Sequence, residues 1–209
     1  MSDKKVFVTA AEVAAELNKG MVIAKRLLLI ASNARALALR AGESAAGFRP
    51  ITDSIDDLVR TTLDSSKVIN GKAQRLSRIA TAENRSALAL SKFNSMYQRD
   101  KDAKYISSLD HVYEETQKQH VALMVEFRKE AKSLNDMLQD LYSELRTAQI
   151  ISTMLSVEAS QAGELYKNQL NSIATSVAES ANAIQSHVSQ SLKLFSELTK
   201  AVYAIKSTV

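Results

Sequence analysis

Residues 30–50 read IASNARALALRAGESAAGFRP, and this stretch decides how the chain folds. It holds two of the five glycines and the only proline, and helical apolar patterns precede and follow it. Gly42 can adopt the left-handed backbone that closes a helix, whereas Pro50 suits the first turn of the next helix. Three aspartates follow soon after, where the free amides of a helix start favour carboxylates. The stretch is therefore predicted to be a hairpin tip near residues 42–50.

The composition favours long helices. Aromatic residues make up 5% of the 209 residues and glycine and proline are scarce, whereas alanine, leucine, serine, lysine and glutamate are common. No cysteine is present, which excludes disulfides, thiolate metal sites and a catalytic cysteine. No secretory signal is visible, and the strongest apolar run, 21–31, is too short to span a bilayer. We expect an all-α, soluble, cytoplasmic protein.

Four amphipathic patterns with heptad spacing follow one another along the chain. The first begins at Thr9, which forms a capping-box pattern with Glu12, and its seam consists mostly of alanine. The third pattern is the strongest and is expected to anchor the core. Its successive leucines are Leu134, Leu138, Leu141 and Leu145. The predicted helices span about 9–41, 50–97, 107–162 and 164–205.

These helices are predicted to form two antiparallel hairpins in a four-helix bundle or coiled coil. The first hairpin covers residues 1–98, a polar linker covers 99–106, and the second hairpin covers 107–209 with a possible tip near 163–168. An Ala-Gly-Glu sequence occurs at 41–43 and again at 162–164, which suggests that the hairpin is duplicated. Coincidence is the alternative, because the shared sequence is short and alanine is common.

The first tip resembles the cytoplasmic signalling hairpin of bacterial methyl-accepting chemoreceptors. That family's tip reads Leu-Asn-Ala-Ala-Ile-Glu-Ala-Ala-Arg-Ala-Gly-Glu and continues to Gly-Phe. Matching residues here are Asn33, Ala34, Ala38, Arg40, Ala41, Gly42, Glu43, Gly47 and Phe48. The family's tip binds a histidine kinase and its coupling protein and packs receptor dimers into trimers. The resemblance therefore implies a non-enzymatic signalling or scaffold protein that docks chemotaxis components through Asn33, Arg40, Glu43 and Phe48.

The sequence also departs from that family. Leu37 and Ala46 stand where the family has glutamate and arginine, and Pro50 stands where it has valine. Reversible methylation needs glutamate or glutamine pairs flanked by small residues, and the only glutamate pair, at 114–115, lacks such flanks. We therefore expect no methylation.

The charges of the tip suggest a docking surface independently of the resemblance. Arg35, Arg40 and Arg49 surround Glu43 and Phe48, and arginine and aromatic residues are the usual anchors of interfaces. Phe48 in a short turn is expected to have little core to enter. Solubilising charge at the end of a bundle is the other interpretation. The predicted partner-binding residues are Asn33, Arg40, Glu43, Phe48 and Arg49.

No catalytic or cofactor-binding constellation is evident, so we expect neither an enzyme nor a metal site. The residues three before each histidine do not complete a di-iron motif. His187 lies on the predicted core seam and is expected to make the bundle acid-sensitive. The basic charge is not arranged in a single stripe with aromatics, so no nucleic acid is expected. A structural amphipathic bundle without a chemotaxis role is the alternative function, and association into a homodimer stays open.

Overall fold

The computed structural model describes residues 2–99, 105–161 and 164–206, and these are all-α, as predicted. Two short 3₁₀ turns, η1 (Gly42–Ala45) and η2 (Ile106–Leu109), precede α2 and α3. No strand occurs in these three described ranges. The α-helices are α1 (Ser2–Ala41), α2 (Phe48–Arg99), α3 (Asp110–Leu145), α4 (Thr147–Gln161) and α5 (Glu164–Lys206).

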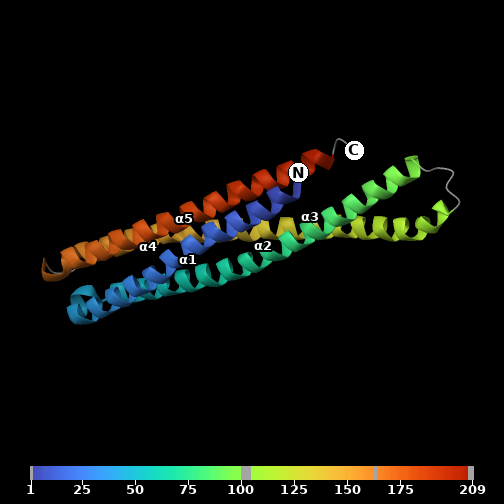
Figure 1. Ribbon diagram of the computed structural model, residues 1–209. Coiled ribbons are helices and arrows are strands. Elements are labelled where there is room, and N and C mark those ends of the chain that lie inside the picture. Colours follow the sequence, from blue (N-terminus) through green and yellow to red (C-terminus); the bar gives the residue numbers. More distant parts are fainter. Residues whose placement is uncertain (1, 100–104, 162–163, 207–209) are drawn as a thin grey trace.

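The helices form an antiparallel bundle with both predicted hairpin tips at one end (Figure 1). α1 packs against α2 and α5, α2 packs against α3, and α4 packs against α5. At the other end the α2–α3 hairpin projects beyond the ends of α1 and α5 (Figure 1). The chain thus has a four-helix region that ends at the two tips and a two-helix region that ends at the 100–104 connection.

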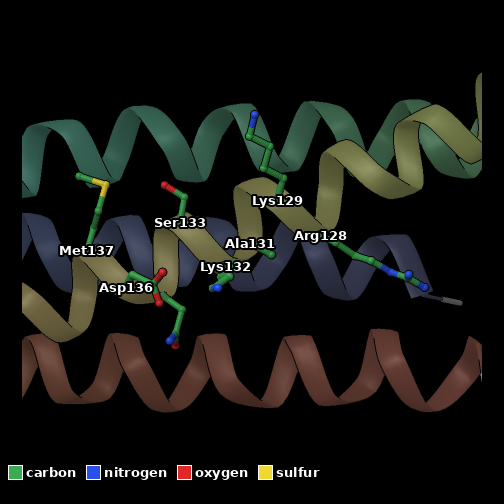
Figure 2. A pocket seen from close by; sticks show the side chains of 8 residues that line it. Arg128, Lys129, Ala131, Lys132, Ser133, Asp136 and Met137 are labelled. Carbon is green, nitrogen blue, oxygen red and sulfur yellow. The ribbon is translucent and has the colours of Figure 1, made fainter.

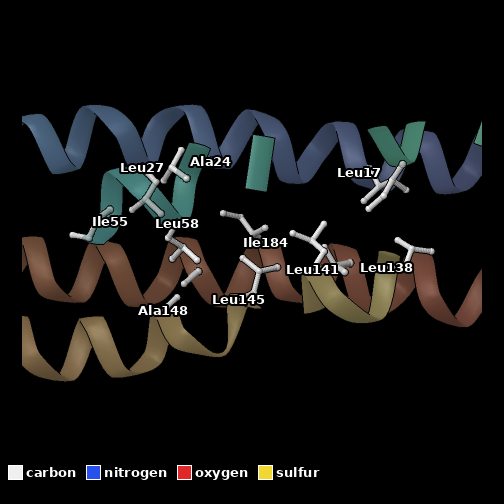
Figure 3. Packing of buried hydrophobic residues seen from close by; sticks show 14 of the residues in the cluster. Leu17, Ala24, Leu27, Ile55, Leu58, Leu138, Leu141, Leu145, Ala148 and Ile184 are labelled. Carbon is white, nitrogen blue, oxygen red and sulfur yellow. The ribbon is translucent and has the colours of Figure 1, made fainter. Parts of the chain in front are cut away.

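Most of the predicted heptad positions lie in one core, but on α5 the buried seam passes through Val188 and not through His187, which is half-buried. Buried residues from all five α-helices belong to a single cluster (Figure 3), and the alanine seam of α1 lies within it. The four leucines of the third pattern are each at most 2% exposed, which confirms that this run anchors the core. Small side chains let helix axes approach closely, so alanine on α1 allows α2 and α5 to pack on either side of it.

Several predicted boundaries are wrong. α1 begins at Ser2, so Thr9 lies inside the helix and does not cap it. α2, however, begins at Phe48, so Pro50 lies in its first turn, as predicted, where the missing proline amide is not needed. α3 begins at Asp110, after the 3₁₀ turn η2, which contains the predicted start at residue 107. Local cap patterns are weak signals when tertiary packing extends a helix.

The third heptad pattern is divided, although it was predicted as one helix. α3 ends at Leu145 and α4 begins at Thr147. At the break the amide of Arg146 bonds to the Ser143 carbonyl at 3.1 Å, and the amide of Gln149 bonds to the Arg146 carbonyl at 3.2 Å. This three-residue spacing tightens the turn, and it keeps Leu145 and Ala148 both in the core.

The chain reverses between α4 and α5, as predicted, because these two helices pack antiparallel (Figure 1). Gly163 lies outside the described residues, and α5 already begins at Glu164, so residues 164–168 are helix and not tip. In the predicted linker, α2 continues to Arg99 and η2 begins at Ile106, while residues 100–104 lie outside the described part.

Candidate docking site

The chain reverses at the first tip through the left-handed backbone conformation that was predicted for Gly42. Gly42 has φ +63°, the only positive φ among the described residues, and it ends α1. The amide of Ala46 bonds to the Glu43 carbonyl, and the amide of Arg49 bonds to the Ala46 carbonyl, both at 3.4 Å. A residue with a Cβ is strained at this φ, so glycine is required for the reversal.

Phe48 is not a surface residue. Its side chain is 0% exposed and belongs to the hydrophobic core, so the prediction that it is a docking contact is wrong. The prediction assumed that a short turn offers an aromatic ring nothing to enter. In the bundle α4 lies against the first tip, and the core therefore continues as far as the first residue of α2.

Arg40, Glu43 and Arg49 are exposed, as a docking role requires. Arg40 comes from the last turn of α1, Glu43 from η1 and Arg49 from the first turn of α2. The three charges therefore surround the reversal itself. The backbone carbonyl of Arg40 accepts a hydrogen bond from the Tyr166 hydroxyl at 3.4 Å, which ties α5 to this end of α1.

Asn33 and Arg40 also line a shallow open groove between α1 and α5. Leu37 and Ile173, both half-buried, supply apolar surface there. The remaining lining residues are Ala36, Asn168, Gln169 and Ser172. The structure thus brings two of the predicted site residues together on one flank of the bundle, and it places Glu43 and Arg49 at the tip.

Arg35 does not belong to a free basic cluster. Its guanidinium bonds to the carboxylates of Asp53 and Asp56, the second at 2.8 Å, and so joins α1 to α2. The Asp56 charge and the bond to Asp53 raise the pKa of Arg35 above its usual value. This arginine therefore closes the hairpin, and of the predicted basic residues only Arg40 and Arg49 are left for a partner.

The two hairpins touch at the first tip through Gly47 and Glu158. A Cβ at position 47 would overlap the carboxylate of Glu158, which reaches over from α4. Gly47 directly precedes α2, so the carboxylate lies beside the positive end of a helix dipole. Glu158 lies on α4, so this contact joins the second hairpin to the first tip.

A further candidate surface on α4 was not found from the sequence. Ile150, Met154 and Val157 are 61%, 49% and 51% exposed and follow one another at helical spacing. Glu158 is the only charged residue of α4, and its carboxylate lies at Gly47. The shortage of charge in residues 147–161 was visible in the sequence, although the heptad pattern suggested burial for this segment.

The surroundings of His120 do not match those of a catalytic triad. His120 Nδ1 lies 3.1 Å from Ser86 Oγ and 3.9 Å from a Glu83 carboxylate oxygen, so the hydroxyl and the carboxylate share one ring nitrogen. A catalytic triad needs them on opposite nitrogens. Within residues 2–99, 105–161 and 164–206 no group of three or more histidine or acidic side chains could hold a metal ion.

A hollow along α3 carries several charged side chains but offers no enclosed site. Figure 2 shows its labelled side chains pointing to both sides of the helix. Arg128, Lys129 and Lys132 are its cations and Asp136 its only acid. Because every lining residue comes from this one helix, the hollow has no opposing wall that could position a ligand.

His187 is half-buried and lies 2.7 Å from Glu16, which joins α5 to α1. Lys19, at 2.6 Å, and His187 both bond to Glu16, and these bonds lower the pKa of its carboxyl below its usual value. A carboxyl whose pKa is lowered on folding stabilises the fold above its unfolded pKa, and this contribution is lost as the pH falls through the folded value.

Glu16→Gln is therefore expected to be less stable than the wild type at pH 7, with the difference shrinking below about pH 4. Thermal melts from pH 3 to pH 7 measure this. Glu12→Gln, four residues away and exposed, is the matched control and should follow the wild type. A difference that is unchanged down to pH 3 would show that Glu16 contributes nothing through its charge.

The far end of the α2–α3 hairpin is closed by aromatic contacts. Tyr113 makes edge-to-face contacts with Phe93 and Tyr97 at centroid distances of 6.1 Å and 5.6 Å. The Tyr97 hydroxyl donates a hydrogen bond to Asp110 at 2.7 Å, which raises the pKa of Tyr97 to about 12. The two helices are thereby joined on either side of residues 100–104.

Asp110→Ala is expected to return the pKa of Tyr97 from about 12 toward the ordinary value near 10. NMR titration of the tyrosine ring carbons resolves this shift. Because a raised tyrosine pKa stabilises the fold at lower pH, the contribution of this bond should be complete below about pH 10 and lost toward pH 12. Asp140→Ala, exposed on the same helix, should leave the Tyr97 titration unchanged.

No protein-family model matches the chain, and the search of curated proteins finds no match. Within the described ranges, no helix combines the length and the apolar character that crossing a bilayer requires.

Proposed function

We propose that this chain is a non-enzymatic, chemoreceptor-like signalling or scaffold protein that docks chemotaxis components at the tip end of its bundle. The observation that carries the proposal is the set of exposed charges, Arg40, Glu43 and Arg49, around a reversal whose sequence resembles the chemoreceptor tip. The kinase, its coupling protein or receptor tips are the proposed partners. A cytoplasmic location goes with these partners.

The architecture supports a docking role. The ion pairs of Arg35 with Asp53 and Asp56 hold α1 and α2 together near the tip, and Glu158 joins the tip to the second hairpin. The tip is therefore held from both hairpins, which lowers the entropic cost of binding a partner. The exposed apolar residues of α4 lie near this end and would extend the charged contact with apolar area.

The alternative is a structural amphipathic bundle with no chemotaxis role. The burial of Phe48 and the pairing of Arg35 favour it, because two of the residues that suggested docking serve the fold. Under this alternative the tip sequence needs only to reverse the chain, and exposed charge around it needs only to keep the end hydrated.

Pull-down of the purified chain with the chemotaxis kinase, its coupling protein and a receptor fragment from the same cell, with mapped cross-links, distinguishes the two functions. Docking predicts cross-links at residues 33–49 and loss of capture in Arg40→Ala. Arg78→Ala, an exposed arginine of α2 remote from the tip, is the matched control and should bind normally. Cross-links elsewhere, or equal capture of both variants, would favour the structural alternative.

A further inference from the structure

The part of the α2–α3 hairpin that projects beyond α1 and α5 is covered by no other helix of the described chain (Figure 1). We call residues 87–99 and 105–119 the stalk. No stalk residue is fully buried, whereas buried residues recur at every turn or two of α2 before it and of α3 after it. The stalk is therefore a two-helix extension of a four-helix core.

The apolar seam of the core continues along the stalk without its cover. On α2, Leu76 and Ile79 are buried, but Leu90 and Phe93, two heptads further along, are only half-buried. On α3, Phe127 is buried, but Tyr113, two heptads earlier, is half-buried. Apolar residues therefore occupy the same heptad positions in the stalk as in the four-helix region. In the stalk, however, they lack the packing that α1 and α5 supply in the four-helix region.

Val121 lies on the side of α3 that faces α5 in the four-helix region. It precedes Tyr142 by three heptads, and Tyr142 lines a hollow together with residues of α5 such as Gln185 and Ser189. At the base of the stalk, Val121 is 54% exposed. Val125, one turn further along, is 62% exposed and shares its heptad position with the outward-facing Lys132 and Gln139.

The charges of the stalk are complementary to one another. On α2, residues 87–99 contain Lys92 and Arg99 and no acidic residue. On α3, residues 110–119 contain Asp110, Glu114 and Glu115 against a single lysine, Lys118. A surface with one basic and one acidic helix is complementary to a second copy of itself when the two are related by a twofold axis.

We propose that the stalk binds the stalk of a second copy of this chain. The two stalks pack antiparallel, so that α2 of one copy lies beside α3 of the other and the half-buried seam is completed to four helices. Each stalk then occupies, beside its partner, the place that α1 and α5 occupy further along the bundle. The two tips of the dimer point in opposite directions and stay free. This inference does not depend on what the tip binds.

Sedimentation equilibrium of the 209-residue chain up to about 100 µM tests the proposal. We expect a monomer–dimer equilibrium that Val121→Asp weakens by about tenfold or more, because a carboxylate would be buried without a partner. Val125→Asp adds the same charge one turn away on the outward face and should leave the dissociation constant within about threefold. Both valines are more than half exposed, so neither variant removes a buried side chain from the folded monomer.

Because the chain has no cysteine, single spin labels give the orientation of the dimer. Labels at Ser95→Cys in the two stalks should lie within about 50 Å, whereas labels at Ala46→Cys in the two tips should lie beyond about 80 Å. A chain that stays monomeric throughout the concentration range would overturn the proposal. So would a short distance between the tip labels, or a dimer that Val121→Asp leaves unchanged or that both aspartate variants weaken equally.

Discussion

Phe48→Ala is expected to lower the free energy of unfolding by about 3 to 5 kcal/mol, which is the usual cost of removing a fully buried aromatic side chain. Phe48 is 0% exposed and belongs to the core cluster at the first residue of α2. The cavity left by the ring would not be filled by movement of the helices, because α2 and α4 are both fixed by packing further along the bundle. Denaturant unfolding followed by circular dichroism measures the change.

Two controls separate burial from proximity to the tip. Arg49→Ala removes an exposed neighbour and should change the stability by no more than about 0.5 kcal/mol. Phe48→Leu keeps most of the apolar volume and should cost less than the alanine variant. If Phe48→Ala unfolded at the same denaturant concentration as the wild type, the ring would not be packed as the structure has it, and a surface role would return.

The local order of the fold could be predicted from the sequence. The heptad seams of the first and third predicted helices were found because burial on a helix repeats every three to four residues, and Gly42 was found because few residues tolerate a positive φ. The all-α class follows from the same pattern. These features depend on neighbours in the sequence, which a single sequence displays directly.

The features that failed depend on contacts between distant segments. The burial of Phe48 requires α4 beside the first tip, and Glu158 reaches Gly47 across more than half the chain. The break at Arg146 has no glycine or proline to mark it. For the candidate docking site, residue type predicted which side chains are charged at the tip. Residue type could not predict that Arg35 would form ion pairs with Asp53 and Asp56 and so be unavailable to a partner.

A leucine in the two-helix region should contribute less to the free energy of unfolding than a leucine in the four-helix region. Leu76→Ala is expected to cost about 2 to 5 kcal/mol, because Leu76 is 1% exposed and its loss leaves a cavity among four helices. Leu90→Ala, at the same heptad position of the same helix, should cost clearly less in dilute solution, since Leu90 is already partly hydrated. Denaturant unfolding of the two variants measures the difference, and equal costs would mean that the stalk is covered.

The same pair of variants links stability to association. Ligand binding to the folded state alone stabilises it in proportion to the logarithm of ligand concentration, and a second copy is such a ligand. If stalks pair, wild-type stability should rise with protein concentration, and the cost of Leu90→Ala should rise with it, because the missing methyl groups then belong to a completed core. The cost of Leu76→Ala should stay constant, because its packing is complete within one chain. If the loss of stability caused by Leu90→Ala did not depend on protein concentration, the half-buried seam of the stalk would remain exposed to water and stalks would not pair.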